Sequence, residues 1–264
     1  MPVKLLSQVK PLVSEVKPLF EPVVKPEPRP TSADPPEFWL YARTYLFLRV
    51  LVGVVGILLP LGLLLLDWLV FRDSADARGS LSAYYYSGGR ELFVAGLVLM
   101  GTVLGTYKIF EWNLDNLFSF LAGVAAMLVA FFPTGRYSTE LALTPLQREW
   151  GEGTVQALHF GAAGTLIVLL GVLSVTFGVR EGNRPPVESQ NQKVSPRNWR
   201  RYHFICAAVI LAALATYGVS KLKGPEMIPN LLLFVECAAL WAFAASWFAA
   251  GWNWPVLRGR RQPD

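Results

Sequence analysis

The chain has 264 residues, of which 53% are apolar and only 16% are charged, and its mean hydropathy is +0.38. So few charged side chains cannot cover a soluble globule of this length, so the composition indicates a membrane protein. The net charge of +5 does not indicate nucleic-acid binding, because the basic residues are spread over separate loops instead of forming one patch.

The first segment, residues 1–38, is rich in proline, and we expect a disordered cytoplasmic tail there. A Val-Lys-Pro-Leu sequence occurs twice in it, at residues 9–12 and 16–19, with apolar residues at roughly helical spacing. Two interpretations stay open: an amphipathic segment whose lysines contact anionic lipid on the membrane surface, or a solvated tail.

Six apolar runs follow the tail. Each is about long enough to cross the roughly 30 Å hydrocarbon core of a bilayer as an α-helix, which satisfies its own backbone hydrogen bonds. We therefore predict an all-α fold, a polytopic transmembrane bundle of six helices in residues 39–255, followed by a basic tail at residues 256–264. The predicted spans are residues 44–67, 91–109, 114–132, 157–178, 202–220 and 229–250.

Lysine and arginine predict the orientation of this bundle. Sixteen of the 24 lie in the segments on the side of the amino terminus, and seven lie in the loops on the other side. Arg49 lies just inside the first span, and we expect its side chain to extend to the membrane surface on the side of the amino terminus. Because cytoplasmic segments are the more basic ones, both termini are predicted to be cytoplasmic. The first apolar run begins after about 40 residues and is too long for a signal peptide, so we expect an uncleaved anchor.

The loop before the second span has an unusual polar sequence. Ser80, Ser82, Tyr84 and Tyr85 supply hydroxyl groups among several glycines, and Arg90 places a guanidinium at the mouth of the span. Such a loop can cap the bundle, or it can present hydrogen-bond donors to a carbonyl or phosphate group. All five residues are candidate ligand-binding residues on the outer side.

Three further candidates lie toward the same side. Thr134 follows the proline that ends the third span, His159 lies near the outer start of the fourth, and Glu236 lies inside the sixth. A carboxylate within a span is costly and usually faces the interior or a cavity, so Glu236 is the strongest polar candidate. Each of the three also has a purely structural interpretation. Two histidines without a His-x-x-x-His pair are too few for a zinc site, and we expect no metal or cofactor.

Small residues recur at one-turn spacing inside the spans. Gly101 and Gly105 form a Gly-x-x-x-Gly pair in the second span, and Ser119 and Gly123 match it in the third. Small side chains let helices approach closely. We expect this to serve packing within the bundle, with a homodimer through such faces as the alternative.

Several short sequences together resemble a family of uncharacterised bacterial multi-pass membrane proteins. The resemblance covers roughly residues 40–255 and rests on Ser80-Leu81-Ser82-Ala83-Tyr84-Tyr85-Tyr86 with Arg90, Asn116 with Ala122-Gly123, Phe132-Pro133-Thr134, Leu158-His159-Phe160, and Glu236 with Trp241-Ala242-Phe243 and Ser246-Trp247. It implies an integral six-span protein of the bacterial plasma membrane. It implies no activity.

The sequence leaves three classes of function open. The first is binding of a lipid headgroup or small amphiphile at the outer polar mouth, with membrane lipids as partners. The second is a proton-coupled or cation-coupled transporter with Glu236 as the ion site, although the two halves of the chain show no matched broken helices. The third is a membrane-embedded lipid hydrolase using Ser82 or Ser80 with His159 and a carboxylate, although no nucleophile-elbow sequence is present.

Overall fold

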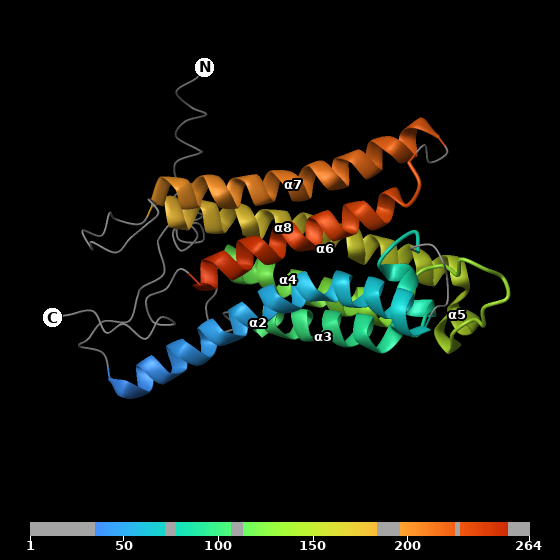
Figure 1. The fold of residues 1–264 in the computed structure, drawn as a ribbon, viewed down its shortest axis with the longest axis horizontal. Helices are drawn as coiled ribbons and strands as arrows, with labels where there is room; N and C mark the ends of the chain where they lie inside the picture. The colour runs from blue at the N-terminus through green and yellow to red at the C-terminus, as the bar shows by residue number, and fades with distance from the viewer. Residues whose placement is uncertain (1–34, 72–77, 107–112, 184–195, 225–227, 253–264) are drawn as a thin grey trace, which may run out of the picture.

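A computed structural model describes residues 35–71, 78–106, 113–183, 196–224 and 228–252 (Figure 1). The described part of the chain contains helices and no strand. Its elements are α2 (Pro36–Leu66), η1 (Asp67–Phe71), η2 (Ser82–Tyr86), α3 (Arg90–Thr106), α4 (Leu114–Phe131), α5 (Pro145–Trp150), α6 (Glu152–Gly182), α7 (Pro196–Lys223) and α8 (Leu231–Trp252). Of the predicted tail 1–38, residues 1–34 with the surface repeat lie outside the described residues, whereas residues 36–38 belong to α2. The second predicted tail, residues 256–264, also lies outside the described residues.

The six long helices pack in a closed ring. Neighbouring pairs in this ring are α2 with α3, α3 with α4, α4 with α6, α6 with α7, α7 with α8, and α8 with α2, while α6 also touches α8 across the interior. Figure 1 shows them lying side by side, with η2 and α5 at one end and the start of α2 and the end of α8 at the other. The chain therefore forms one helical bundle around a shared apolar core.

The bundle has the surface of a membrane protein. Five of the described helices, α2, α4, α6, α7 and α8, are long and apolar enough to cross a bilayer. Large apolar side chains such as Phe47, Leu58, Phe131 and Phe234 are exposed on the outside of the bundle. Water disfavours such a surface and lipid does not. The predicted all-α helical bundle is confirmed. The sixth long helix, α3, is not among these five, and the structure describes it over 17 residues only.

Glycines allow α3 and α4 to touch through their backbones. A Cβ atom built at Gly123 would lie 2.5 Å from the carbonyl oxygen of Gly101 and 2.6 Å from the amide nitrogen of Gly105. The hydroxyl of Ser119 adds a hydrogen bond of 2.7 Å to the carbonyl of Leu104. The prediction that these small residues serve packing inside the bundle is therefore confirmed for this helix pair.

Local sequence explains where several helices begin. Pro35 is the N-cap of α2 and Pro36 is its first residue, a position in the first turn where a missing amide hydrogen costs nothing. Asn113 caps α4 by accepting a hydrogen bond of 2.9 Å from the amide of Asn116. Gly151, with φ of 84°, separates α5 from α6 in a backbone conformation that other residues rarely adopt.

Candidate functional site

Two segments close one end of the bundle, and we call them together the cap: residues 78–89, which include η2, and residues 132–151, which include α5. The Tyr86 hydroxyl joins them by donating a hydrogen bond of 2.8 Å to the carbonyl of Thr134. The Gln147 side chain donates to both the Tyr86 hydroxyl, at 2.7 Å, and the same carbonyl, at 3.1 Å. The two segments are thus held as one unit.

Ion pairs fasten the cap to the helix ends. The guanidinium of Arg78 lies 3.2 Å from the Asp67 carboxylate in η1, and both side chains are buried. In the second segment, Arg136 pairs with Glu152 at the start of α6 at 3.0 Å. Buried charges require such partners, so the buried Arg78–Asp67 pair fixes the position of the cap on the bundle, and the partly exposed Arg136–Glu152 pair adds a second attachment.

Glu236 of α8 binds the first cap segment through hydrogen bonds from the side of the helices. Its Oε2 accepts a hydrogen bond of 2.5 Å from the backbone amide of Leu81, and its Oε1 accepts one of 3.2 Å from the hydroxyl of Ser82. The carbonyl of Gly79 also accepts a backbone hydrogen bond of 3.0 Å from Leu233. The partly buried carboxylate therefore meets two donors of the loop that begins η2, and this explains how it is accommodated in an apolar helix.

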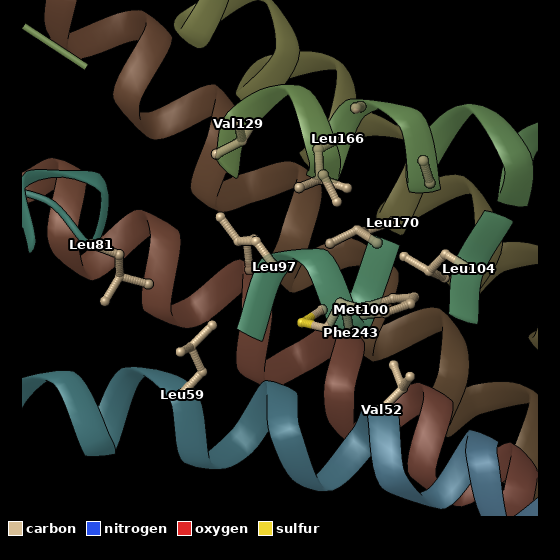
Figure 2. Close-up of a cluster of buried hydrophobic side chains, with 14 of the residues drawn as sticks. Val52, Leu59, Leu81, Leu97, Met100, Leu104, Val129, Leu166, Leu170 and Phe243 are labelled. Carbon is tan, nitrogen blue, oxygen red and sulfur yellow. The ribbon is translucent and has the colours of Figure 1, made fainter. Parts of the chain in front are cut away.

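A small cavity lies beside this carboxylate. It has a volume of about 70 Å³, and Glu236 and Ser82 are the polar residues among its lining. The rest of the lining is apolar and comes from α2, α3, α4, α6 and α8 together with Leu81. Figure 2 shows six of these side chains around the shared space: Leu59, Leu81, Leu97, Val129, Leu166 and Leu170. This volume holds a few water molecules at most and no lipid headgroup.

Arg90 and Tyr85 form a second arrangement, on the surface. The Arg90 guanidinium lies over the Tyr85 ring, 4.4 Å from its centroid, and donates a hydrogen bond of 2.8 Å to the Tyr85 hydroxyl. Tyr85 is buried whereas Arg90 is exposed. The buried ring therefore fixes the direction of an exposed cation that still has unused N–H donors among the described contacts.

This cation lies at one end of an open groove of about 550 Å³ between α3 and α4. The groove is lined by Tyr85, Arg90, Glu91, Val94, Ala95, Val98, Ala130 and Phe131. Arg90, Val94 and Val98 are spaced by four residues, so they form one stripe along α3 that runs about 12 Å from the charge into the apolar part of the bundle. The volume lies within the range of small-molecule sites.

The other predicted site residues have partners within the cap. The Ser80 hydroxyl accepts a hydrogen bond of 3.0 Å from the amide of Ala83 in η2. Tyr84 is buried below the Arg78 guanidinium, and burial raises its pKa. Thr134 is buried and contributes its carbonyl, as described above. The Nδ1 atom of His159 lies 2.6 Å from the carbonyl of Phe132.

The predicted residues thus fall into separate groups. Glu236 and Ser82 meet at the cavity, Arg90 and Tyr85 meet at the groove, and His159 contacts the backbone that ends α4. A hydrolase needs its nucleophile within hydrogen-bonding distance of a base. Within the described residues the Ser82 hydroxyl donates to a carboxylate and no serine is hydrogen-bonded to His159, so these contacts give the hydrolase hypothesis no support.

Sequence reasoning missed a second polar cluster at the end opposite the cap. Arg49 is only 3% exposed, and its guanidinium lies 5.2 Å from the ring centroids of both Phe177 and Trp247. It is therefore enclosed by aromatic rings, whereas the sequence favoured a side chain that reaches the membrane surface. Nearby on α7, His203 is fully buried and its Nδ1 lies 2.8 Å from the hydroxyl of Ser246.

A buried ion pair accompanies this cluster. Arg180 of α6 lies 2.6 Å from the carboxylate of Asp115 in α4, which also accepts a hydrogen bond of 3.2 Å from Thr176. The sequence contains a signal that could have predicted this pair. Asp115 lies at the start of the predicted span 114–132 and Arg180 lies just after the predicted span 157–178, so both lie on the same side of the predicted bundle. Opposite charges at adjacent helix ends on one side are candidates for pairing.

The helices and their apolar surface define the class of this chain, an α-helical membrane protein. No protein-family model, curated protein or solved structure matches it.

Proposed function

We propose that this protein binds a phosphate-bearing amphiphile, such as a membrane lipid, in the groove between α3 and α4. The phosphate lies at Arg90, and the apolar chain lies along Val94 and Val98. Of the predicted ligand-binding residues, Arg90 and Tyr85 remain part of the proposed site. The other six hold the cap in place: Ser80, Ser82, Tyr84, Thr134, His159 and Glu236.

The observation that carries the proposal is the cation at the end of an apolar groove. Arg90 is exposed, and the buried Tyr85 ring holds its guanidinium in a fixed direction. Pre-orientation lowers the entropy lost on binding, and the planar guanidinium suits phosphate oxygens. The rest of the lining, apart from Glu91, consists of Tyr85 and apolar side chains. An amphiphile has the same division into a charged end and an apolar chain.

Native mass spectrometry of the purified protein tests this proposal. We expect the wild-type protein to retain lipid in detergent, and we expect Arg90→Ala to lower the retained fraction about tenfold, since a hydrogen bond to a charged group contributes about 1.5–3 kcal/mol.

Arg148→Ala is the matched control, because Arg148 is exposed on α5 in the same cap but does not line the groove. Equal lipid retention in the Arg90→Ala and Arg148→Ala proteins contradicts the proposal.

We also propose that the bundle crosses a bacterial plasma membrane six times with both termini in the cytoplasm. The excess of lysine and arginine on the side of the termini supports this orientation. Cysteines placed one at a time at Arg148 and at Asn198, in a protein that carries Cys206→Ser and Cys237→Ser, provide the test. The first is expected to react with a membrane-impermeant thiol reagent in intact cells, and the second only after lysis; the reverse pattern contradicts the orientation.

A second candidate function rests on Glu236. A carboxylate beside a central cavity is a common element of proton pathways in membrane proteins, and the cavity has room for water. Under this alternative, proteoliposomes that contain a pH-sensitive dye acidify in response to a membrane potential, and Glu236→Gln abolishes the change. Equal proton flux in the wild-type and variant proteins removes this candidate.

A further inference from the structure

The groove contains an acidic group as well as Arg90. Glu91 follows Arg90 in the first turn of α3, is exposed, and lines the same groove. Adjacent helix residues do not face each other, and within the described residues the two side chains form no ion pair. The mouth of the groove therefore presents a cation and an anion whose charges do not neutralise each other.

Two stripes of small apolar residues continue from these charges. Val94 follows Arg90 by four residues, and Ala95 follows Glu91 by four, so each charge stands at the head of its own stripe on α3. Across the groove, Ala130 and Phe131 end α4, and the Phe131 side chain is 59% exposed. The groove therefore has two opposite charges at one end and an apolar floor of two stripes beyond them.

We propose that the amphiphile in this groove is a zwitterionic phospholipid with a primary ammonium group, of the phosphatidylethanolamine class. This inference rests on the function proposed above. The lipid phosphate binds Arg90, the ammonium group donates hydrogen bonds to the Glu91 carboxylate, and an acyl chain follows Val94, Ala95 and Val98. A lipid with a phosphate alone leaves Glu91 without a partner and places two negative charges close together.

The ammonium group also distinguishes this lipid from phosphatidylcholine. A primary ammonium has three N–H donors for a carboxylate, whereas a quaternary ammonium has none and is bound best by aromatic faces. In the described groove, Arg90 covers one face of the buried Tyr85 ring, so Phe131 is the single exposed aromatic side chain in the lining, whereas a quaternary ammonium is bound by a cage of several rings. The groove therefore favours the primary amine.

Competition between lipids with identical acyl chains tests the inference. Purified protein in detergent is mixed with equimolar phosphatidylethanolamine, phosphatidylglycerol and phosphatidylcholine, and the bound lipids are counted by native mass spectrometry. We expect the wild-type protein to prefer phosphatidylethanolamine over both others by about tenfold, and Glu91→Gln to abolish this preference while it leaves phosphatidylglycerol binding equal or stronger.

Glu149→Gln is the control, since Glu149 is exposed on α5 and does not line the groove. It is expected to keep the wild-type preference. The inference is overturned if the wild-type protein shows no preference among the three lipids, or if Glu91→Gln keeps the preference. It is also overturned if Glu91→Gln weakens all three lipids equally, because this indicates that Glu91 only stabilises the amino-terminal end of α3.

These results separate the two proposals. A protein that binds all three lipids alike, and loses them in Arg90→Ala, retains the proposed function and refutes only the choice of lipid. A protein whose lipid content is the same in Arg90→Ala and Arg148→Ala refutes both.

Discussion

Replacing Glu236 tests whether this carboxylate holds the cap on the bundle. In Glu236→Ala, the buried amide of Leu81 and the hydroxyl of Ser82 lose the acceptors that they now reach at 2.5 and 3.2 Å. A buried donor without a partner costs about 1–3 kcal/mol, and the larger cavity adds about 1 kcal/mol. We therefore expect the free energy of unfolding to fall by about 3 kcal/mol.

Glu236→Gln provides a graded comparison. The amide side chain keeps one oxygen for the Leu81 amide but loses the negative charge, so we expect a loss of about 1 kcal/mol. Glu149→Ala, on the exposed face of α5, is the control and is expected to change stability by less than about 0.5 kcal/mol.

Two measurements check this ranking. Denaturant unfolding in detergent micelles gives the loss of stability for each variant. Hydrogen exchange followed by mass spectrometry reports on residues 79–86, which are expected to lose protection in Glu236→Ala before the helices do. If Glu236→Ala unfolds like Glu149→Ala and residues 79–86 keep their protection, the carboxylate does not hold the cap and our interpretation of its contacts is wrong.

Three further predictions follow from the packing. Gly123→Ala is expected to cost about 1–3 kcal/mol, because its Cβ would meet the backbone of α3. Gly164→Ala is the control and is expected to be neutral, because a Cβ there meets nothing within 4 Å. Equal thermal stability of the two variants refutes the close packing of α3 and α4. Asp115→Asn removes the negative charge that Asp115 places beside the buried Arg180 guanidinium, and it is expected to lower the free energy of unfolding by about 3–5 kcal/mol. Replacing both residues by apolar ones is expected to recover most of this loss. Burial raises the pKa of Tyr84 and Tyr86 in the folded protein, so their contribution to stability is complete below about pH 10 and is lost as the pH rises through the raised values. Tyr41 of α2 is exposed, so Tyr41→Phe is the control. Melting temperatures between pH 8 and 12 should therefore fall less steeply for Tyr86→Phe than for Tyr41→Phe, and parallel curves count against this effect.

The sequence was sufficient to predict the helices, because apolar length is a direct physical requirement for crossing a bilayer. Each predicted span overlaps one of the long helices, and α6 and α7 extend beyond their spans at both ends. Residues 107–109 of the second predicted span lie outside the described residues. α6 covers residues 152–182 where the apolar run covers 157–178, and α7 covers 196–223 where the run covers 202–220. Hydropathy marks only the part in hydrocarbon, whereas the helical hydrogen bonds continue through charged residues at the interface.

The grouping of the polar residues was harder to predict. Glu236, Ser82, Arg90 and Tyr85 were all recognised as unusual, yet nothing in the sequence indicates that Glu236 binds the Leu81 amide while Arg90 lies over Tyr85. Such contacts depend on how the cap folds back over the ring of helices. Glu91 was overlooked because a single acidic residue in the first turn of a helix is ordinary. The buried Arg49 was missed because its enclosure requires aromatic rings from α6 and α8.

Photocrosslinking shows whether a lipid occupies the α3–α4 groove and whether its binding depends on Arg90. The purified protein is illuminated with a phospholipid that carries a diazirine in its acyl chain, and the labelled peptides are identified by mass spectrometry. We expect labels concentrated on residues 91–98 of α3 and 130–131 of α4, lost in Arg90→Ala and kept in Arg148→Ala. Labels spread evenly over the exposed faces of all the helices, and unchanged in Arg90→Ala, would contradict this expectation.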